Sequence, residues 1–317
     1  MFGVRVWHLA ARAVWQSAQP VRSGGVIALR SFSSFREPAR TEREKYVSVE
    51  HEHDGQAVHI VLNRPALKNA LCRSMAKEIS ECVEDMRKLM DRRNPAAPRV
   101  VVIRSAVAGA FCSGADLKER KFMSHEQARE FSNFLRRTFA NIASLPIPVI
   151  GCVAGYALGG GAELLLACDI RVGSSKAVLG FPETSHAIIP GAGGSATLAR
   201  LVGISRAKDL IFTARRVSAR EAKELGLLNY VCGDDSDKAE SGELALQKTR
   251  DLTAQIIQNG PLALKLAKRC IDSSVDVDLP TALLLEGELY KETFGSKDRE
   301  EGLEAFNEKR KPVYVGR

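Results

Sequence analysis

Two glutamates in the middle of this chain carry side chains suited to general acid–base chemistry. Glu163 follows three consecutive glycines and opens an apolar run, and Glu183 stands 20 residues further on, after Gly180-Phe181-Pro182. A carboxylate in apolar surroundings is costly unless it is paired or used, because burial disfavours its charged form. Two such carboxylates around one ligand can activate a water molecule and transfer a proton. The pair therefore predicts a site that adds water to its ligand.

Glycine-rich turns next to these acids can supply backbone N–H donors. One turn is Gly159-Gly160-Gly161, and the other is segment 109–118, directly after a predicted strand. N–H groups at tight turns and helix starts can stabilise an oxygen that gains negative charge, and each contributes about 3–4 kcal/mol in a transition state. The residues alone predict two cooperating carboxylates and leave open which is the acid and which is the base.

Hydrophobic periodicity predicts the elements that position these residues. The predicted strands are 47–52, 57–62, 100–103, 149–154 and 169–172, and the predicted helices include 71–92 and 124–144. Strands that alternate with helices indicate an α/β fold with parallel strands. We expect this core to cover residues 47–250, because the pattern is helical only from about residue 251 to 317.

The N-terminal segment has a composition of its own. Residues 1–36 contain five arginines, no lysine and no acid, and residues 1–14 form an amphipathic helical pattern. This is typical of a mitochondrial transit peptide and predicts a matrix protein, with residues 1–32 removed and residues 33–46 as a linker. A secretory signal is disfavoured, since no long apolar segment is present. Removal of four arginines would lower the formal charge from +8 to +4, which weakens a nucleic-acid interpretation.

Other classes of site find little support in the sequence. The seven cysteines are scattered without a C-x-x-C pair, so we expect reduced thiols and no metal site. The run His51-Glu52-His53-Asp54 contains possible metal ligands, but alternation into an Asp54-Gly55 turn favours a β-hairpin. No stretch approaches the ~20 apolar residues of a membrane span, which predicts a soluble mature protein.

Five segments in order resemble the enoyl-CoA hydratase/isomerase (crotonase) superfamily, from about residue 47 to 317. They are Leu62-Asn63-Arg64-Pro65 with Asn69-Ala70-Leu71, the loop 111–118, the segment 155–163, the segment 182–194 and Phe306-Asn307-Glu308-Lys309-Arg310-Lys311. Each segment is weak alone, but the ordered set is specific. One departure is Ser195-Ala196-Thr197, where relatives usually carry Thr-Gln-Arg, and it bears on packing more than on chemistry.

The resemblance implies a role for each matching residue. It implies that the N–H groups of Ala115 and Gly160 form an oxyanion hole, and that Glu163 activates a water while Glu183 protonates the substrate carbon. The CoA-contacting positions that it implies are Ala66, Lys68, Ser113, Gly114, Ala115, Asp116, Phe306 and Lys309. Phe306 and Lys309 would reach the CoA of a neighbouring subunit. Coenzyme A belongs to the substrate, and no other cofactor is implied.

The same resemblance implies a fold, an assembly and a reaction. The fold would be a spiral of ββα repeats with a C-terminal helical trimerisation region, and the assembly a trimer or a dimer of trimers. Both glutamates together favour a hydratase over an isomerase that uses only the second. The implied substrates are trans-2-enoyl-CoA thioesters of fatty-acid or branched-chain amino-acid origin. The motifs look most like mitochondrial methylglutaconyl-CoA hydratases, which keeps that more specific activity as an alternative.

Rival interpretations account for less of the sequence. Segment 191–196 fits G-x-G-x-x-A, but Pro190 interrupts the apolar run that a dinucleotide site would require before it. Ser113 lacks the flanking glycines of a nucleophile elbow. RNA binding, known for methylglutaconyl-CoA hydratase relatives, is disfavoured because the charges on the helix 71–92 nearly cancel. Taken singly, Glu163 could be a helix-end acid and Glu183 an exposed loop acid.

Overall fold

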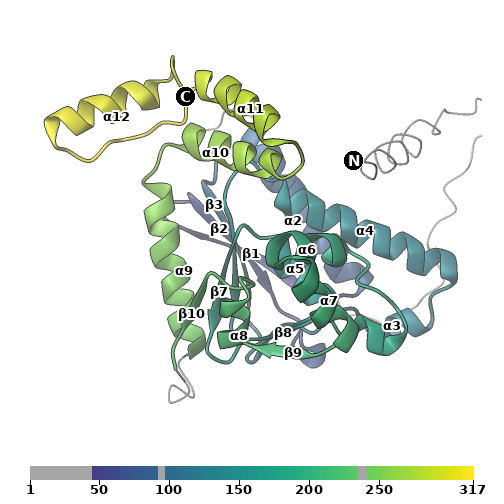
Figure 1. Ribbon diagram of the computed structural model, residues 1–317. Coiled ribbons are helices and arrows are strands. Elements are labelled where there is room, and N and C mark those ends of the chain that lie inside the picture. Colours follow the sequence, from purple (N-terminus) through teal and green to yellow (C-terminus); the bar gives the residue numbers. More distant parts are fainter. Residues whose placement is uncertain (1–44, 92–96, 235–240) are drawn as a thin grey trace, which may run out of the picture. The chain divides into compact units, whose positions relative to one another are not determined.

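The computed structural model describes residues 45–91, 97–234 and 241–317, and Figure 1 labels their helices and strands. The predicted transit peptide lies outside the described residues, as does all of the predicted linker except Lys45 and Tyr46. The described unit is an α/β structure, as the sequence predicts. Two sheets and the helices around them position the candidate site residues.

The larger sheet has six strands in the order β1-β2-β3-β5-β7-β10. Their bounds are β1 Val47–Glu52, β2 Ala57–Leu62, β3 Val100–Ser105, β5 Val149–Val153, β7 Ile170–Ser174 and β10 Tyr230–Cys232. Strands β1 and β2 are antiparallel, and every later pair is parallel. The predicted hairpin is confirmed, and His53 and Asp54 take left-handed conformations in its turn.

Helices cover both faces of this sheet, which explains why strands β2 and β5 are buried along their whole length. Helices α2 (Arg73–Asp91) and α4 (His125–Ala143) correspond to the two predicted helices and pack against each other. Along β3, Val101 and Ile103 point into the large core that includes these helices. Val100 and Val102 point the other way, into a smaller core with α9 (Ser241–Ile257).

A smaller sheet, β4-β6-β8-β9, was not predicted because its strands are only three residues long. Its strands are β4 Ala110–Cys112, β6 Tyr156–Leu158, β8 Val178–Gly180 and β9 Arg216–Ser218. Strands β3, β5 and β7 of the larger sheet are followed by β4, β6 and β8 in turn, and a helix comes next each time. Those helices are α3 (Leu117–Lys121), α5 (Gly160–Leu166) and the 3₁₀ helix η2 (Pro182–His186). The helix starts therefore meet at one edge, because β4, β6 and β8 run parallel.

The remaining helices connect and extend this core. They are η1 Pro65–Leu67, α6 Gly194–Val202, α7 Ile204–Thr213, α8 Ala219–Glu224, α10 Pro261–Ser274, α11 Leu279–Lys291 and α12 Lys297–Glu308. Helices α10 to α12 gather at one end of the described unit (Figure 1). The predicted core limit at residue 250 falls inside α9, whose residues pack on the larger sheet.

The C-terminal residues are fixed to the core by polar contacts. Arg99 donates to the carbonyl oxygens of Ile257 and Tyr314, at 2.9 and 2.8 Å. Asp298 accepts hydrogen bonds from the N–H groups of Val315 and Gly316. Among the described residues, no helix is long and apolar enough to cross a membrane.

Candidate active site

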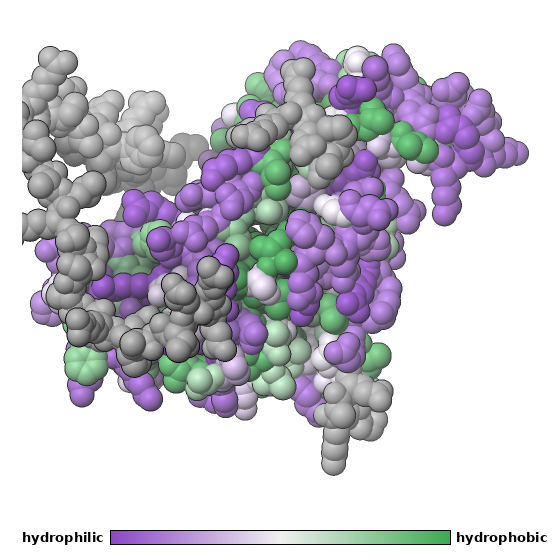
Figure 2. Space-filling model, turned by 180° about the vertical axis from the view of Figure 1, so that it is seen from behind, coloured by the Kyte–Doolittle hydropathy of each residue, from purple (hydrophilic) through white to green (hydrophobic). Residues whose placement is uncertain are grey.

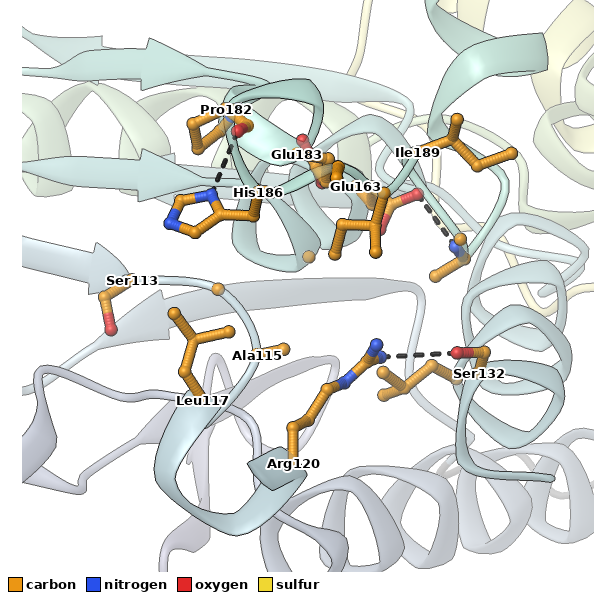
Figure 3. Close-up of a pocket in the computed structure, with 18 residues that line it drawn as sticks. Ser113, Ala115, Leu117, Arg120, Ser132, Glu163, Pro182, Glu183, His186 and Ile189 are labelled. Atoms are coloured by element: carbon orange, nitrogen blue, oxygen red, sulfur yellow. Dashed lines mark hydrogen bonds between the residues drawn. The ribbon is translucent and has the colours of Figure 1, made fainter. Parts of the chain in front are cut away.

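The helix starts of α3, α5 and η2 border a cavity of about 530 Å³. Six of the residues predicted to form the site line this cavity together: Ser113, Gly114, Ala115, Gly160, Glu163 and Glu183. Figure 3 shows Glu163 and Glu183 on one wall, with Ser113 and Ala115 on the wall below them. The structure thus brings the two carboxylates and the two glycine-rich turns of the sequence into one site.

Glu163 lies in the first turn of α5 and is 6% exposed. One carboxylate oxygen, Oε1, accepts hydrogen bonds from the N–H groups of Ala192 and Gly194, both at 2.8 Å. Burial raises the pKa of this carboxyl group, while the two N–H donors and the charge of Arg120 act in the opposite direction. The N–H donors fix the side chain and favour its ionised form.

Glu183 lies in the first turn of η2, behind Pro182, and is 8% exposed. Burial raises its pKa to about 7, and the nearby charge of Glu163 adds to this rise. Its Oε2 atom is buried and has no hydrogen-bond partner among the described residues. An oxygen of this kind is available to a ligand in the cavity.

Two glycines leave room for the carboxylates. A Cβ atom added at Gly194 would lie 2.7 Å from Cγ of Glu163. A Cβ atom added at Gly159 would lie 3.1 Å from Oε1 of Glu183, and the φ angle of Gly159 is +50°. Larger residues at either position would displace the acids.

The backbone of Ala115 and that of Gly160 approach each other across the cavity. Gly114 O and Asp116 N are hydrogen bonded to Leu71, so the intervening N–H of Ala115 points to the opposite side. The N–H of Gly160, at the first position of α5, has no intrahelical acceptor. A Cβ atom built on Gly160 would lie 3.8 Å from the nitrogen of Ala115. Both N–H groups are therefore placed to bind one oxygen atom.

The other residues predicted to contact CoA lie outside the cavity lining. Ala66 and Lys68 are exposed, and the carbonyl oxygen of Lys68 accepts a hydrogen bond from Ser113 N at 3.0 Å. The Asp116 carboxylate pairs with Arg64 at 2.8 Å and caps α3. Its side chain therefore has a structural role in holding the loop.

Phe306 and Lys309 are also separate from the cavity lining. Phe306 is 82% exposed in the last turn of α12, and Lys309 ends that helix in a left-handed conformation. Within this chain the structure does not bring them to the two glutamates. Their predicted contact with a neighbouring subunit stays a prediction.

Arg120 is a lining residue that the sequence analysis did not single out. It lies in α3, and its Nη2 atom donates to Ser132 Oγ of α4 at 3.3 Å. Arg120 stands one turn after the predicted loop, but in the sequence it looks like one more charge in the run Lys118-Glu119-Arg120-Lys121. His186 and the turn containing Ala192 were also missed as parts of the cavity.

The segment 191–196 binds the carboxylate of Glu163 through its backbone and does not have the surroundings of a dinucleotide site. The N–H groups of Ala192 and Gly194 bind Glu163, and the preceding named element is the 3₁₀ helix η2 where a nucleotide fold would have a strand. In the described part of the chain, no group of three or more His, Cys, Asp or Glu residues could hold a metal ion. None of the seven cysteines forms a disulfide.

The raised pKa of Glu183 predicts a pH-dependent stability. The folded state holds the proton more tightly than the unfolded state, whose pKa is about 4.5, so this stabilisation is complete at low pH and is lost as pH rises through about 7. We expect a loss of about 2 kcal/mol, allowing for solvent screening. The free energy of unfolding in urea, measured for the wild type and Glu183→Gln between about pH 4 and pH 8, gives this loss.

The control for this titration is Glu130→Gln, which removes an exposed carboxylate of α4. The difference in unfolding free energy between the wild type and Glu183→Gln should change with pH, and Glu130→Gln shows how much of any change comes from replacing a surface carboxylate with an amide. Parallel curves for all three proteins would show that Glu183 titrates normally.

Comparison with known proteins places the chain in a family. The model of the family described as enoyl-CoA hydratase/isomerase matches residues 52–317. Human mitochondrial methylglutaconyl-CoA hydratase is 41% identical over 97% of this chain and 87% of its own length. Human mitochondrial enoyl-CoA hydratase domain-containing protein 2 is 42% identical over 83% of this chain and 87% of its own length.

A solved structure agrees with these relatives. The crystal structure of an enoyl-CoA hydratase from Bacillus anthracis superposes with a TM-score of 0.79 at 42% identity, and the match covers 86% of this chain and 100% of that one. The predictions of the superfamily and of an enzyme of the hydro-lyase type are confirmed at this level. The chain therefore belongs to the enoyl-CoA hydratase/isomerase family.

Proposed function

We propose that this protein is an enoyl-CoA hydratase, which adds water across the 2,3 double bond of a trans-2-enoyl-CoA thioester. The observation that carries the proposal is the meeting of Glu163 and Glu183 with the N–H groups of Ala115 and Gly160 around one cavity. The reaction needs no redox or metal chemistry, and coenzyme A enters as part of the substrate.

The backbone donors would act on the thioester carbonyl. Addition of water at Cβ pushes negative charge onto the carbonyl oxygen, and the two N–H groups stabilise that oxygen as the charge develops. One N–H belongs to the loop before α3 and the other to the first residue of α5, and because both are backbone groups they need no rearrangement when the charge appears. Ala115 and Gly160 thus provide an oxyanion hole in this proposal.

The two carboxylates differ in their surroundings, which supports different roles. Glu163 receives two N–H hydrogen bonds that favour its ionised form, so it is suited to take a proton from the attacking water. Glu183, with a pKa of about 7, holds a proton near neutral pH and is suited to give it to Cα. The environment thus favours one assignment where the sequence left both open.

The acyl group of the substrate is less defined than the reaction. Relatives at 41% and 42% identity carry different names, methylglutaconyl-CoA hydratase and enoyl-CoA hydratase domain-containing protein 2. Short-chain and branched enoyl-CoA thioesters are therefore proposed as the substrate class, with methylglutaconyl-CoA of leucine degradation as the more specific alternative. Relative kcat/KM values for straight, branched and carboxylated enoyl-CoA substrates distinguish these proposals.

The CoA portion would leave the cavity past Ser113. Lys68 lies beside Ser113, where its exposed side chain can meet a phosphate, and Ala66 precedes it by two residues. Phe306 and Lys309 of a neighbouring subunit would complete this binding in the proposed assembly. Replacing Lys68 or Lys309 should raise KM with little change in kcat, and unchanged KM values would exclude these contacts.

We also propose that the chain forms a trimer or a dimer of trimers through its C-terminal helices. Helices α10 and α11 have few buried residues and expose Ile271, Val275, Leu279, Leu283 and Leu284. The C-terminal helices lie at the upper right of Figure 2, where apolar residues lie among polar ones on the surface. The recurring strand–strand–helix order supports the proposed spiral arrangement. A monomeric mass in sedimentation equilibrium would contradict the assembly.

A mitochondrial matrix location is proposed from the first 32 residues and from the relatives named as mitochondrial. Import into isolated mitochondria with shortening of the chain would support it. A full-length product left outside would contradict it.

RNA binding is the candidate function of another class, and the structure favours it less. On α2, Lys77 pairs with Glu81 and Lys88 pairs with Asp85, so these cations already have acidic neighbours. RNA affinity that appears at low salt and falls steeply with added salt would support this function.

Replacement of either glutamate should abolish most of the hydration activity. We expect Glu163→Gln and Glu183→Gln each to lower kcat by about 10²- to 10⁴-fold, because each removes a proton-transfer group. The loss in kcat of the double variant should be much smaller than the product of the two single losses, since the residues act in one step. Loss of the ultraviolet absorbance of the conjugated thioester in crotonyl-CoA measures the rate.

Glu130→Gln serves as the matched control for these activities, because it makes the same change on the exposed surface of α4. Its rate should equal that of the wild type. Equal rates for the wild type and the double variant would refute the proposed mechanism.

The backbone donor at Gly160 can be removed by proline, which the first helical position tolerates. We expect Gly160→Pro to lower kcat by about 10²-fold or more, because proline lacks the N–H and its ring fills the space in front of the nitrogen. Gly160→Ala is the comparison variant, because it keeps the N–H. Its Cβ would approach the end of the Leu71 side chain at 3.2 Å and would be in ordinary contact with Ala115 N at 3.8 Å and Glu163 Oε2 at 3.9 Å. Similar rates for both folded variants would argue against an oxyanion hole at this position.

A further inference from the structure

We propose that Arg120 is a specificity residue that binds a carboxylate at the far end of the acyl group. The preferred substrates would then be enoyl-CoA thioesters of dicarboxylic acids. This inference rests on the proposed function, because it concerns the acyl group in the same cavity. It is carried by the position and the incomplete hydrogen bonding of the guanidinium group.

Arg120 lies at the end of the cavity where an acyl chain would finish. In Figure 3, Ser113 and Ser132 stand at opposite sides of the view, with Ala115 between them and Arg120 reaching toward the Ser132 side. The thioester carbonyl would lie at Ala115, and CoA would leave past Ser113. The acyl chain therefore extends from the glutamates toward Arg120 and Ser132.

The guanidinium group of Arg120 is only partly satisfied by the protein. It has five N–H donors, and the structure shows one hydrogen bond, from Nη2 to Ser132 Oγ at 3.3 Å. Its Nε atom is buried and has no hydrogen-bond partner among the described residues. A buried charged donor without an acceptor is costly, so the site is completed when a ligand supplies one.

The glutamates do not account for this arginine. Among the described residues Arg120 forms no ion pair within 4.0 Å. Its guanidinium group lies over the ring of Phe131, 5.6 Å from the centroid, and the charges of Glu163 and Glu183 reach it over a longer distance. Oε1 of Glu163 already accepts two N–H hydrogen bonds. Burial lowers the pKa of Arg120, but arginine remains a cation at neutral pH.

A carboxylate fits these donors better than the end of an alkyl chain. Its two oxygens match the fork of a guanidinium group, and such paired hydrogen bonds are strong. The hydroxyl of Ser132, which accepts from Arg120, has its own proton to donate to the same carboxylate. An alkyl chain would bury Arg120 further and leave Nε without a partner. Arg120 would also offset the repulsion between the new carboxylate and the two glutamates.

Binding of two saturated thioesters tests the inference without any reaction. Glutaryl-CoA has a distal carboxylate, butyryl-CoA does not, and neither has a double bond to hydrate. The dissociation constants of both are measured by calorimetry with the full chain. The wild type should bind glutaryl-CoA at least about 10-fold more tightly than butyryl-CoA. Arg120→Met should weaken the binding of glutaryl-CoA by about 10- to 100-fold and leave the binding of butyryl-CoA nearly unchanged.

Arg136→Met is the matched control. Arg136 lies in α4, donates to the carbonyl oxygen of Gly191 at 2.8 Å and influences Glu163, but it does not line the cavity. This variant should keep the preference for glutaryl-CoA. Arg120→Lys keeps the positive charge but loses the paired N–H donors of the guanidinium group, so it should retain part of the preference for glutaryl-CoA.

Three results would overturn the inference: no preference in the wild type, equal weakening of both ligands by Arg120→Met, or the same effect from Arg136→Met. The crotonyl-CoA assay separates these results from a failure of the proposed function. Wild-type protein that hydrates crotonyl-CoA but does not prefer glutaryl-CoA would leave the hydratase intact and exclude this role for Arg120. A protein that prefers glutaryl-CoA but hydrates nothing would support the role and exclude the hydratase.

Discussion

The two N–H hydrogen bonds to Glu163 are the interaction on which the rest of the site depends. A buried carboxylate would otherwise take up a proton or turn away from the cavity. The N–H groups of Ala192 and Gly194 fix one oxygen of Glu163 and favour its charge. Burial raises the pKa of Glu183, and the charge of Glu163 adds to this rise, so two chemically equal side chains acquire different properties. In the proposed mechanism, the surroundings of each side chain thus decide which one acts as the acid and which as the base.

The fold delivers these groups through its repeated order of strand, short strand and helix. Parallel strands bring successive helix starts to one edge, so residues distant in the sequence reach a common cavity. Backbone N–H groups at such starts lack acceptors, which makes the edge receptive to negative charge. Glycine at positions 159 and 194 allows the close approach, because a Cβ atom there would press on the carboxylates.

The sequence predicted the main elements and six of the cavity residues, because these depend on local signals. Apolar periodicity located α2 and α4, and the glycines and glutamates marked the turns. It missed β4, β6 and β8, which are too short for a periodic signal and are defined by long-range pairing. It also missed Arg120, whose place in the cavity follows from tertiary packing and not from its neighbours in sequence. The differing environments of Glu163 and Glu183 became visible only in three dimensions.

In the proposed mechanism, a water molecule held by two carboxylates becomes the hydroxyl group of the product. Incubation of the protein with crotonyl-CoA in ¹⁸O-labelled water, followed by mass spectrometry of the thioester, follows this oxygen atom. We expect one ¹⁸O atom at C3 of 3-hydroxybutyryl-CoA, and little label with the Glu163→Gln protein. Unlabelled thioester with a shifted or unchanged double bond would contradict hydration as the reaction.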